Sequence, residues 1–402
     1  IASIALDHNF GGGLSLRNRT LAGDYDKFYQ NIYPSSAVST AGNVTLAAYS
    51  DTTKRRNLFS QTDLVWGGRI GGIDQTLLAG FELGGSTGRN QRNNGVFAAT
   101  GTGSLVRPLS DVTVDAPVTF IANGNNADIE TNVAAVYVQD QIRPTDWLEI
   151  VAGLRFDRLR VEVENRATGA EFGRTDNLWS PRLGLVLKPL ANLSLYASYS
   201  RSYLPQSGDQ FNSLSLTAES LKPERFDNYE VGAKWEPVPG LLATAAIYQL
   251  DRTNVQARDP ANPALAVLTG EQRARGVELG LERSVTDRWL ISAGYAWQKA
   301  EITEAIGTSP VIPEGREVPL VPRHSVSLWN RYDVTDRLGL GLGVIARSKS
   351  YASLSNAVKL PGYARVDVAA FYDLTDRIEA QLNVENLLGT DYFPTAHNDN
   401  NI

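Results

Sequence analysis

The sequence predicts an all-β protein, an antiparallel transmembrane β-barrel, and three observations carry this prediction. Short turns recur along the chain, long polar segments alternate with them, and the stretches in between alternate apolar and polar residues. Successive side chains on a β-strand point to opposite faces, so a period of two indicates strands that present one apolar and one polar face.

The short turns share residue types that favour a chain reversal. Asp, Asn, Gly and Pro supply the side-chain hydrogen bonds or the backbone angles that a tight turn needs. Eight such turns predict eight hairpins and therefore about 16 strands. In chain order they are GGG (11–13), GGID (71–74), PTDW (144–147), PLAN (189–192), EPVPG (236–240), VTDR (285–288), VTDR (334–337) and LTDR (374–377).

The flanking stretches show the alternation clearly. After PLAN, Leu193 and Leu195 fall on one face and Ser194 on the other. We expect the apolar face to meet lipid and the polar face to line a lumen, because charged and amide side chains cannot form a dry core. The expected outward residues include Leu195, Val368, Leu382 and Val384, and the expected inward ones Ser194, Asp367, Gln381 and Glu385.

Long polar segments are expected to be loops at the opposite edge of the sheet from the short turns. This strict alternation is typical of outer-membrane barrels, whose periplasmic turns are short and whose external loops are long. A soluble propeller or sandwich is the alternative, but soluble sheets seldom reach so many long strands without splitting. The expected loops are 31–43, 84–128, 164–177, 204–222, 256–266, 302–317 and 348–360.

Aromatic residues gather near both ends of the expected strands. A bilayer selects Trp and Tyr at each of its two interfaces, so two aromatic belts are expected. The candidates are Trp147, Trp235 and Trp289 beside short turns, and Tyr33, Tyr203 and Tyr392 toward the long loops.

Composition excludes several classes of protein and site. The chain has no Cys, which excludes disulfides, thiolate zinc sites and thiol catalysis. The formal net charge of −6 argues against a nucleic-acid partner. The three histidines, His8, His324 and His397, stand apart from any catalytic or metal-binding motif. We therefore expect neither an enzyme nor a resident metal or cofactor.

Four stretches carry a family resemblance that covers nearly all of the chain. They resemble TonB-dependent outer-membrane receptors, and most of all the ferric-siderophore receptors of catecholate type. The stretches are NVAAVYVQDQIRPTDWLEIVAGLRFDR (132–158), LKPERFDNYEVGAKWE (221–236), VPRHSVSLWNRYD (321–333) and PGYARVDVAAFYDLTDRIEAQLNVENLLGTDYF (361–393).

The resemblance implies a location, an activity and partners. It implies the outer membrane of a Gram-negative bacterium and the energy-coupled import of a ferric siderophore, so iron would arrive already chelated. It also implies contact with the TonB complex through an N-terminal segment, and contact with outer-membrane lipid and lipopolysaccharide. Two alternatives stay open: a passive porin, and a receptor of the same family for haem, cobalamin or a saccharide. A surface enzyme or adhesin on a barrel is a third.

The same resemblance implies that residues 1–402 are part of a larger barrel. Receptors of this family have about 22 strands around a plug. By that comparison we expect the N-terminal plug, the first strands and the final strand to be absent from this chain. The stretch TDYFPTAHNDNNI (390–402) would then be the last external loop.

A bulky anionic iron chelate calls for Arg together with aromatic side chains at the external mouth. Arg347 is the first candidate. It lies an even number of residues from Gly339, Gly341 and Gly343 and therefore falls on the same face of the strand, the expected lumen face. Arg155, deeper on that face, is the second. The remaining candidates lie in or near expected loops and are Arg92 with Phe97, Arg201, Tyr203, Phe211, Arg273 and Arg275.

By their positions in the strands, four of these candidates fall on the face that is expected to meet lipid. Arg201 and Tyr203 share it with Leu195, and Arg273 and Arg275 share it with Leu279. Either a β-bulge shifts the register near the rim, or these residues are interface anchors and not ligand contacts.

Overall fold

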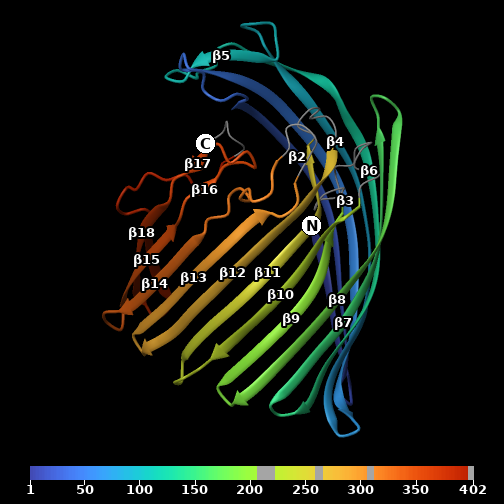
Figure 1. The fold of residues 1–402 in the computed structure, drawn as a ribbon, viewed down its shortest axis with the longest axis vertical. Helices are drawn as coiled ribbons and strands as arrows, with labels where there is room; N and C mark the ends of the chain where they lie inside the picture. Colours follow the sequence, from blue (N-terminus) through green and yellow to red (C-terminus); the bar gives the residue numbers. More distant parts are fainter. Residues whose placement is uncertain (206–221, 259–265, 306–311, 397–402) are drawn as a thin grey trace.

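A computed structural model describes residues 1–205, 222–258, 266–305 and 312–396, where the regular secondary structure consists of β-strands (Figure 1). In those ranges no helix is long and apolar enough to cross a membrane. The strands are β1 (Ala2–Gly11), β2 (Leu14–Pro34), β3 (Asn43–Ile70), β4 (Ile73–Phe97), β5 (Ser104–Pro108), β6 (Val118–Thr145), β7 (Leu148–Asn165), β8 (Ala170–Leu190), β9 (Leu193–Leu204), β10 (Glu224–Trp235), β11 (Leu241–Arg258), β12 (Ala266–Thr286), β13 (Trp289–Ile302), β14 (His324–Asp333), β15 (Leu338–Arg347), β16 (Ser350–Tyr351), β17 (Lys359–Leu360), β18 (Tyr363–Thr375) and β19 (Ile378–Val384).

Seventeen of these strands form one antiparallel sheet. Each long strand pairs with the next long strand along the chain, and the short strand β5 pairs beside β3. From β9 onward the order continues through β15 to β18 and β19, while β16 and β17 form a separate pair. Apart from β5, the sheet therefore has the sixteen strands that the eight hairpins predicted.

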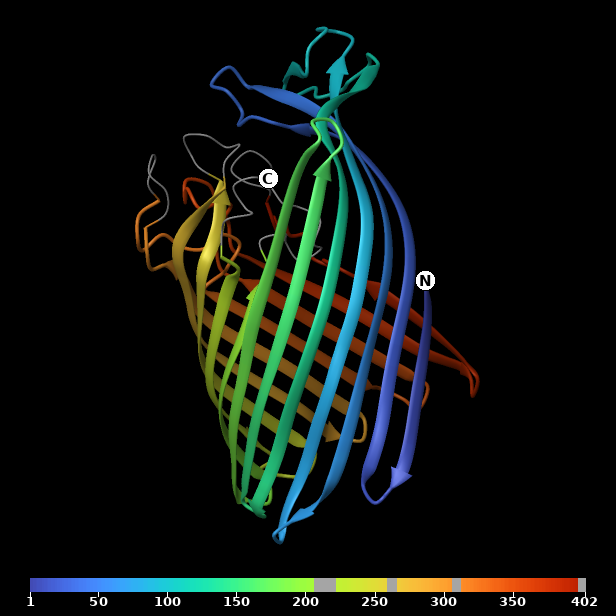
Figure 2. The ribbon, with the colours of Figure 1, turned by 90° about the vertical axis from the view of Figure 1, so that its right-hand side faces the viewer.

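The sheet curls around an open interior, and β1 and β19 form its two edges (Figures 1 and 2). Among the described residues no pairing joins β1 to β19. All eight predicted short turns lie at one end of the strands, and the longer connections lie at the other end.

Between β2 and β8, all three expected loops are shorter than the sequence suggested. Strand β4 extends to Phe97 and β6 begins at Val118, so the connection is 98–117 and not 84–128. Likewise β2 and β3 are joined by 35–42, and β7 and β8 by 166–169. The reason is that the backbone ladder continues beyond the membrane, where polar side chains are free to occupy both faces of a strand.

The registers align side chains into rows that cross the sheet. One outward row contains Leu195, Ala233, Ala245 and Leu279, which are direct partners on β9 to β12. Its neighbours include Val231, 61% exposed, and Ile247, 65% exposed. Val368, Leu382 and Val384 lie on the same face, so the predicted outward series is confirmed.

The opposite face forms the wall of the lumen, and its aromatic rings lie flat against glycines. A Cβ on Gly232 would come within 2.5 Å of the Tyr196 ring, and a Cβ on Gly341 within 2.6 Å of the Trp329 ring. Only glycine leaves room for the ring at these positions, so aromatic area covers backbone that would otherwise face water.

Two aromatic belts border the outward apolar band, as predicted. Near the short turns, Trp235 and Trp289 are 46% and 37% exposed. At the other border Tyr199 and Tyr229 pack with ring centroids 5.0 Å apart. Of the three tyrosines expected in the external belt, Tyr203 lies on the outward face. Tyr33 lies beyond the band on the lumen-facing series of β2, and Tyr392 stacks on the lumen-facing Tyr363, so these two expectations were wrong.

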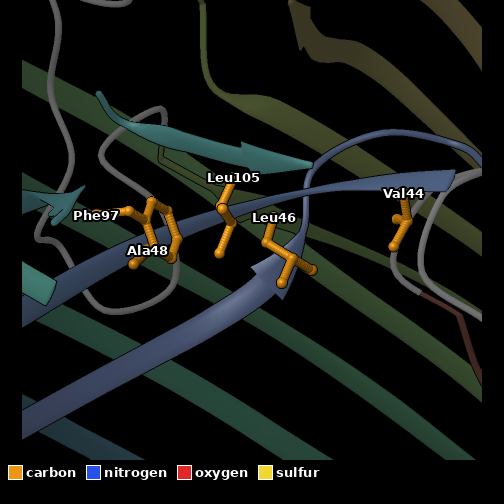
Figure 3. Close-up of a cluster of buried hydrophobic side chains, with 5 residues drawn as sticks. All are labelled: Val44, Leu46, Ala48, Phe97 and Leu105. Carbon is orange, nitrogen blue, oxygen red and sulfur yellow. The ribbon is translucent and has the colours of Figure 1, made fainter. Parts of the chain in front are cut away.

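Beyond the apolar band, β2 and β3 extend into an arm that bends across the open end of the sheet (Figures 1 and 2). A small core holds the arm and the 98–117 segment together (Figure 3). It consists of Val44, Leu46 and Ala48 on β3, Phe97 on β4 and Leu105 on β5. These side chains take the outward-facing positions of β3 and β4, which leaves the other face of the arm free.

The two faces can be tested with a matched pair of substitutions on β11. Ala245 faces outward in the middle of the apolar band, and Ala246 faces the lumen opposite Glu278. Ala245→Lys should reduce the free energy of unfolding by about 2–4 kcal/mol, and Ala246→Lys should change it little. Urea titrations of the protein in lipid vesicles would measure both, and equal losses would contradict the assignment of the faces.

Candidate functional site

The best-defined cluster at the open end of the lumen surrounds Arg92. Its guanidinium carbon lies 3.8 Å from the centre of the Tyr49 ring, and it forms a 3.8 Å ion pair with Asp51. Tyr29 and Tyr33 pack against Tyr49 at centroid distances of 5.7 and 5.5 Å. All five residues lie on the face of the arm opposite its apolar core. The arrangement offers stacking surfaces and a cation to a ligand at the mouth.

The position of this cluster corrects one expectation. Arg92 was expected in the longest loop together with Phe97, but both lie in β4 and on opposite faces of it. Phe97 is fully buried in the core of the arm, which excludes it from direct ligand contact. Arg92 keeps 40% of its side chain exposed, so it remains accessible.

The Tyr49 phenol at the centre of the cluster remains protonated at neutral pH. Burial, followed by the charge of neighbouring Tyr29, raises the pKa of Tyr49 above its usual range. A phenol already has a pKa near 10, so this shift keeps Tyr49 a neutral hydrogen-bond donor under physiological conditions.

A second cluster lies at the same end of β15 and β18. Arg347 faces the lumen beside Tyr363, as its parity predicted. Tyr363 stacks on Tyr392 with ring centroids 4.6 Å apart, and Arg365 donates a 3.0 Å hydrogen bond to the Tyr392 hydroxyl. Arg347 is exposed and forms no ion pair with any described residue, so its charge is free to meet a ligand.

Arg155 also faces the lumen, but its charge is already matched. It forms ion pairs with Asp157 at 2.7 Å and with Glu82 at 2.9 Å. Its guanidinium carbon lies 5.3 Å from the centre of the Tyr137 ring, and Tyr137 donates a hydrogen bond to Asp63. This network connects β3, β4, β6 and β7. Its geometry favours a structural role for Arg155, in which it holds these strands of the lumen wall together.

Arg201 and Tyr203 do not face the lumen, which corrects their assignment as ligand contacts. The β9–β10 register runs from Leu193 to Leu204 without a bulge, so both residues stay on the outward face. Arg201 forms a 2.7 Å ion pair with Asp227 there. Arg273 is likewise outward and paired with Asp251 at 2.5 Å, and Arg275 lies on the same face. Phe211 lies outside the described residues.

The fold and these sites can be compared with known proteins. A family model described as TonB dependent receptor-like, beta-barrel, matches residues 1–387. The chain belongs to the TonB-dependent receptor family, as its β-barrel part. The family is one of receptors in the outer membrane of Gram-negative bacteria, and this places the protein there.

Two curated relatives of this TonB-dependent receptor illustrate the extent of similarity. The probable TonB-dependent receptor BfrD of Bordetella pertussis is 33% identical over 71% of this chain and 41% of its own length. The catecholate siderophore receptor Fiu of Escherichia coli K12 is 24% identical over 98% of this chain and 56% of its own length. The chain thus spans about half the length of the curated relatives it matches.

A solved structure supports the fold. The siderophore receptor PiuA of Acinetobacter baumannii superposes with a TM-score of 0.87 at 24% identity, covering 99% of this chain and 61% of that protein. This likeness extends over the whole curled sheet and establishes the barrel architecture.

The residues around the two candidate arginines were not predicted from the sequence, and they are Tyr29, Tyr49, Tyr363 and Arg365. For Tyr29 a signal existed in the spacing of the residues. Tyr29 and Tyr33 are four residues apart on one strand and therefore share a face. Their pairing with Tyr49 depends on the β2–β3 register, which a single sequence does not reveal.

The arm should depend on its small core. Removing a buried Phe ring typically costs about 3–5 kcal/mol, so Phe97→Ala should release the 98–117 segment. Hydrogen exchange should then accelerate in 98–117, while β9 to β12 keep their protection. An exchange pattern identical to the parent protein would show that the core does not hold the arm.

Proposed function

We propose that this receptor imports a ferric siderophore across the outer membrane by energy-coupled transport. The single observation that carries the proposal is the cluster of Arg92 with Tyr29, Tyr33 and Tyr49 on the arm over the mouth. A ferric siderophore with aromatic chelating groups combines flat rings with negative charge. Tyrosine rings can stack on the aromatic chelating groups, and an arginine can pair with the negative charge.

Arg347 supplies a second contact in this proposal. It lies at the external end of the lumen wall beside the stacked Tyr363 and Tyr392. Two arginine–tyrosine clusters, one on the arm and one on the wall, would contact different sides of a bulky ligand. Arg155 lies deeper and would contact the complex only after it leaves the mouth.

The names of relatives support the cargo class. PiuA is described as a siderophore receptor and Fiu as a catecholate siderophore receptor. For this chain a ferric catecholate is therefore the first cargo to test. Haem, cobalamin and a saccharide would require different contact residues at the external mouth. They are the alternatives that the binding assay distinguishes.

The energy for import would come from the inner membrane. In this proposal the TonB complex engages an N-terminal segment, and movement of a plug opens the path through the lumen. Outer-membrane lipid and lipopolysaccharide would surround the outward face. No nucleic-acid partner and no resident cofactor enter the proposal, since iron is carried by the chelate.

The binding site can be tested with two arginines of one strand. Arg92→Ala should weaken ferric-siderophore binding more than tenfold, because a charge-assisted hydrogen bond is worth about 1.5–3 kcal/mol. Arg89→Ala is the control, since Arg89 faces outward and pairs with Asp128 at 2.8 Å. Fluorescence quenching of the receptor by a panel of ferric siderophores, haem, cobalamin and saccharides would give both affinities.

Binding by Arg92→Ala and Arg347→Ala together at the parent affinity would contradict the assigned site. Transport is tested separately by growth under iron limitation on single siderophores, with and without the gene. Uptake that persists at the same rate after loss of the inner-membrane energy source would indicate a passive channel instead.

A further inference from the structure

The β4–β6 ladder has a bulge at the base of the arm. On one side of it Gln91 pairs with Asn126, and on the other side Asn93 pairs with Ala122. Residues 123–125 of β6, called the β6 bulge below, therefore stand opposite a single residue of β4. Because the register shifts by two residues, the alternation of faces is the same before and after the bulge.

The residue opposite the β6 bulge is Arg92, the central cation of the candidate site. On its other side Arg92 pairs in register with Asp51 of β3. A bulge lengthens and bends its own strand, and beside a functional site it re-aims side chains. Since β6 is the longer strand here, the sheet curves with β6 on its outer side, toward β3 and β2. This is the direction in which the arm crosses the open end (Figure 1).

Gly124 gives the β6 bulge its backbone shape. Its φ is +85°, a conformation that residues with a Cβ rarely adopt. A Cβ at this position would meet no heavy atom within 4 Å, so available space does not explain the glycine. The backbone angle at the bend therefore requires it.

The turn between β7 and β8 supports the β6 bulge through one side chain. Asn165 Nδ2 donates a 3.2 Å hydrogen bond to the backbone oxygen of Gly124. Its Oδ1 accepts hydrogen bonds from the backbone N–H groups of Ala167 at 2.9 Å and Thr168 at 3.2 Å. Pairing of β6 with β7 begins only at Ala127, so Asn165 takes the place of a strand neighbour at the bulge.

We propose that the β6 bulge and Asn165 together fix the angle of the arm, which makes Asn165 a positioning residue for the Arg92 site. The ligand is that of the proposed function, on which this inference rests, whereas the angle of the arm is a property of the receptor alone. Without the bond from Asn165 the arm samples more angles, and Arg92 meets the ligand in fewer of them. A smaller population of the competent state lowers the apparent affinity by the same fraction.

Two substitutions each remove one part of this arrangement, and each has a control at the opposite end of the barrel. Asn165→Asp keeps the acceptor oxygen for the turn and loses the donor to Gly124. Its control is Asn192→Asp, because Asn192 Nδ2 donates a 2.8 Å hydrogen bond to the backbone oxygen of Glu236. Gly124→Ala strains the backbone. Gly240→Ala imposes the same strain at a short turn, where φ is +78° and a Cβ also meets nothing within 4 Å.

The angle of the arm is measured on the full-length receptor in lipid vesicles, by electron paramagnetic resonance between two spin labels. Residues 1–402 contain no Cys, so Ala37→Cys on the arm and Ala357→Cys between β16 and β17 provide a defined pair of exposed labels. Asn165→Asp and Gly124→Ala should broaden the distance distribution, and both controls should keep that of the parent. A distribution that stays unchanged in both variants would overturn the proposal.

Binding of the ferric complex of a triscatecholate siderophore then tests the link to Arg92. Asn165→Asp should weaken binding about three- to tenfold, the effect of one lost hydrogen bond, and Asn192→Asp should not. When Arg92 is already Ala, Asn165→Asp should cause no further loss, because a positioning residue acts through the residue that it positions. A further loss of the same size would overturn the positioning role. A parent receptor that binds no ferric siderophore would contradict the proposed function alone, and the label distances would still decide what sets the angle of the arm.

Discussion

The lack of hydrogen-bond partners in lipid is the constraint on which this structure depends. A backbone that crosses the hydrocarbon region must satisfy its own N–H and C=O groups, and here neighbouring strands do so in one continuous antiparallel ladder. The alternation of strand side chains then divides the sheet into a lipid face and a lumen face. A slip of one residue would move Glu278 into lipid and Leu279 into the lumen, so burial in the membrane locks the register.

The same alternation explains the site above the membrane. Where the lipid ends, the outward positions no longer need apolar residues, and pairs such as Asp24 with Arg56 appear. On the arm the outward positions become apolar again, because Val44, Leu46 and Phe97 pack beneath the segment that contains β5. The tyrosines and Arg92 occupy the remaining face and are thereby directed away from that core.

Sequence patterns predicted the turns, the strand number and the lumen parity of Arg347 because each of these depends on local residue order. They failed for the upper half of β4, where Gly84, Gly85, Gly88 and Asn90 have the composition of a loop. Pairing with β3 and β6 holds this stretch as strand, so a tertiary interaction overrides local propensity. The cluster around Arg92 depends on that same pairing and was not predictable for the same reason.

The role of each arginine follows from its partner and its level in the membrane more than from its proximity to a loop. Arg155 has two carboxylates within 3 Å and is bound to the wall. Arg201 shares Asp227 with Arg225 on the outward face and is held there. Arg347 faces the lumen and lacks a carboxylate partner among the described residues. Because an unpaired cation gains by pairing with an anion, we expect Arg347, and not Arg155 or Arg201, to be available to an anionic ligand.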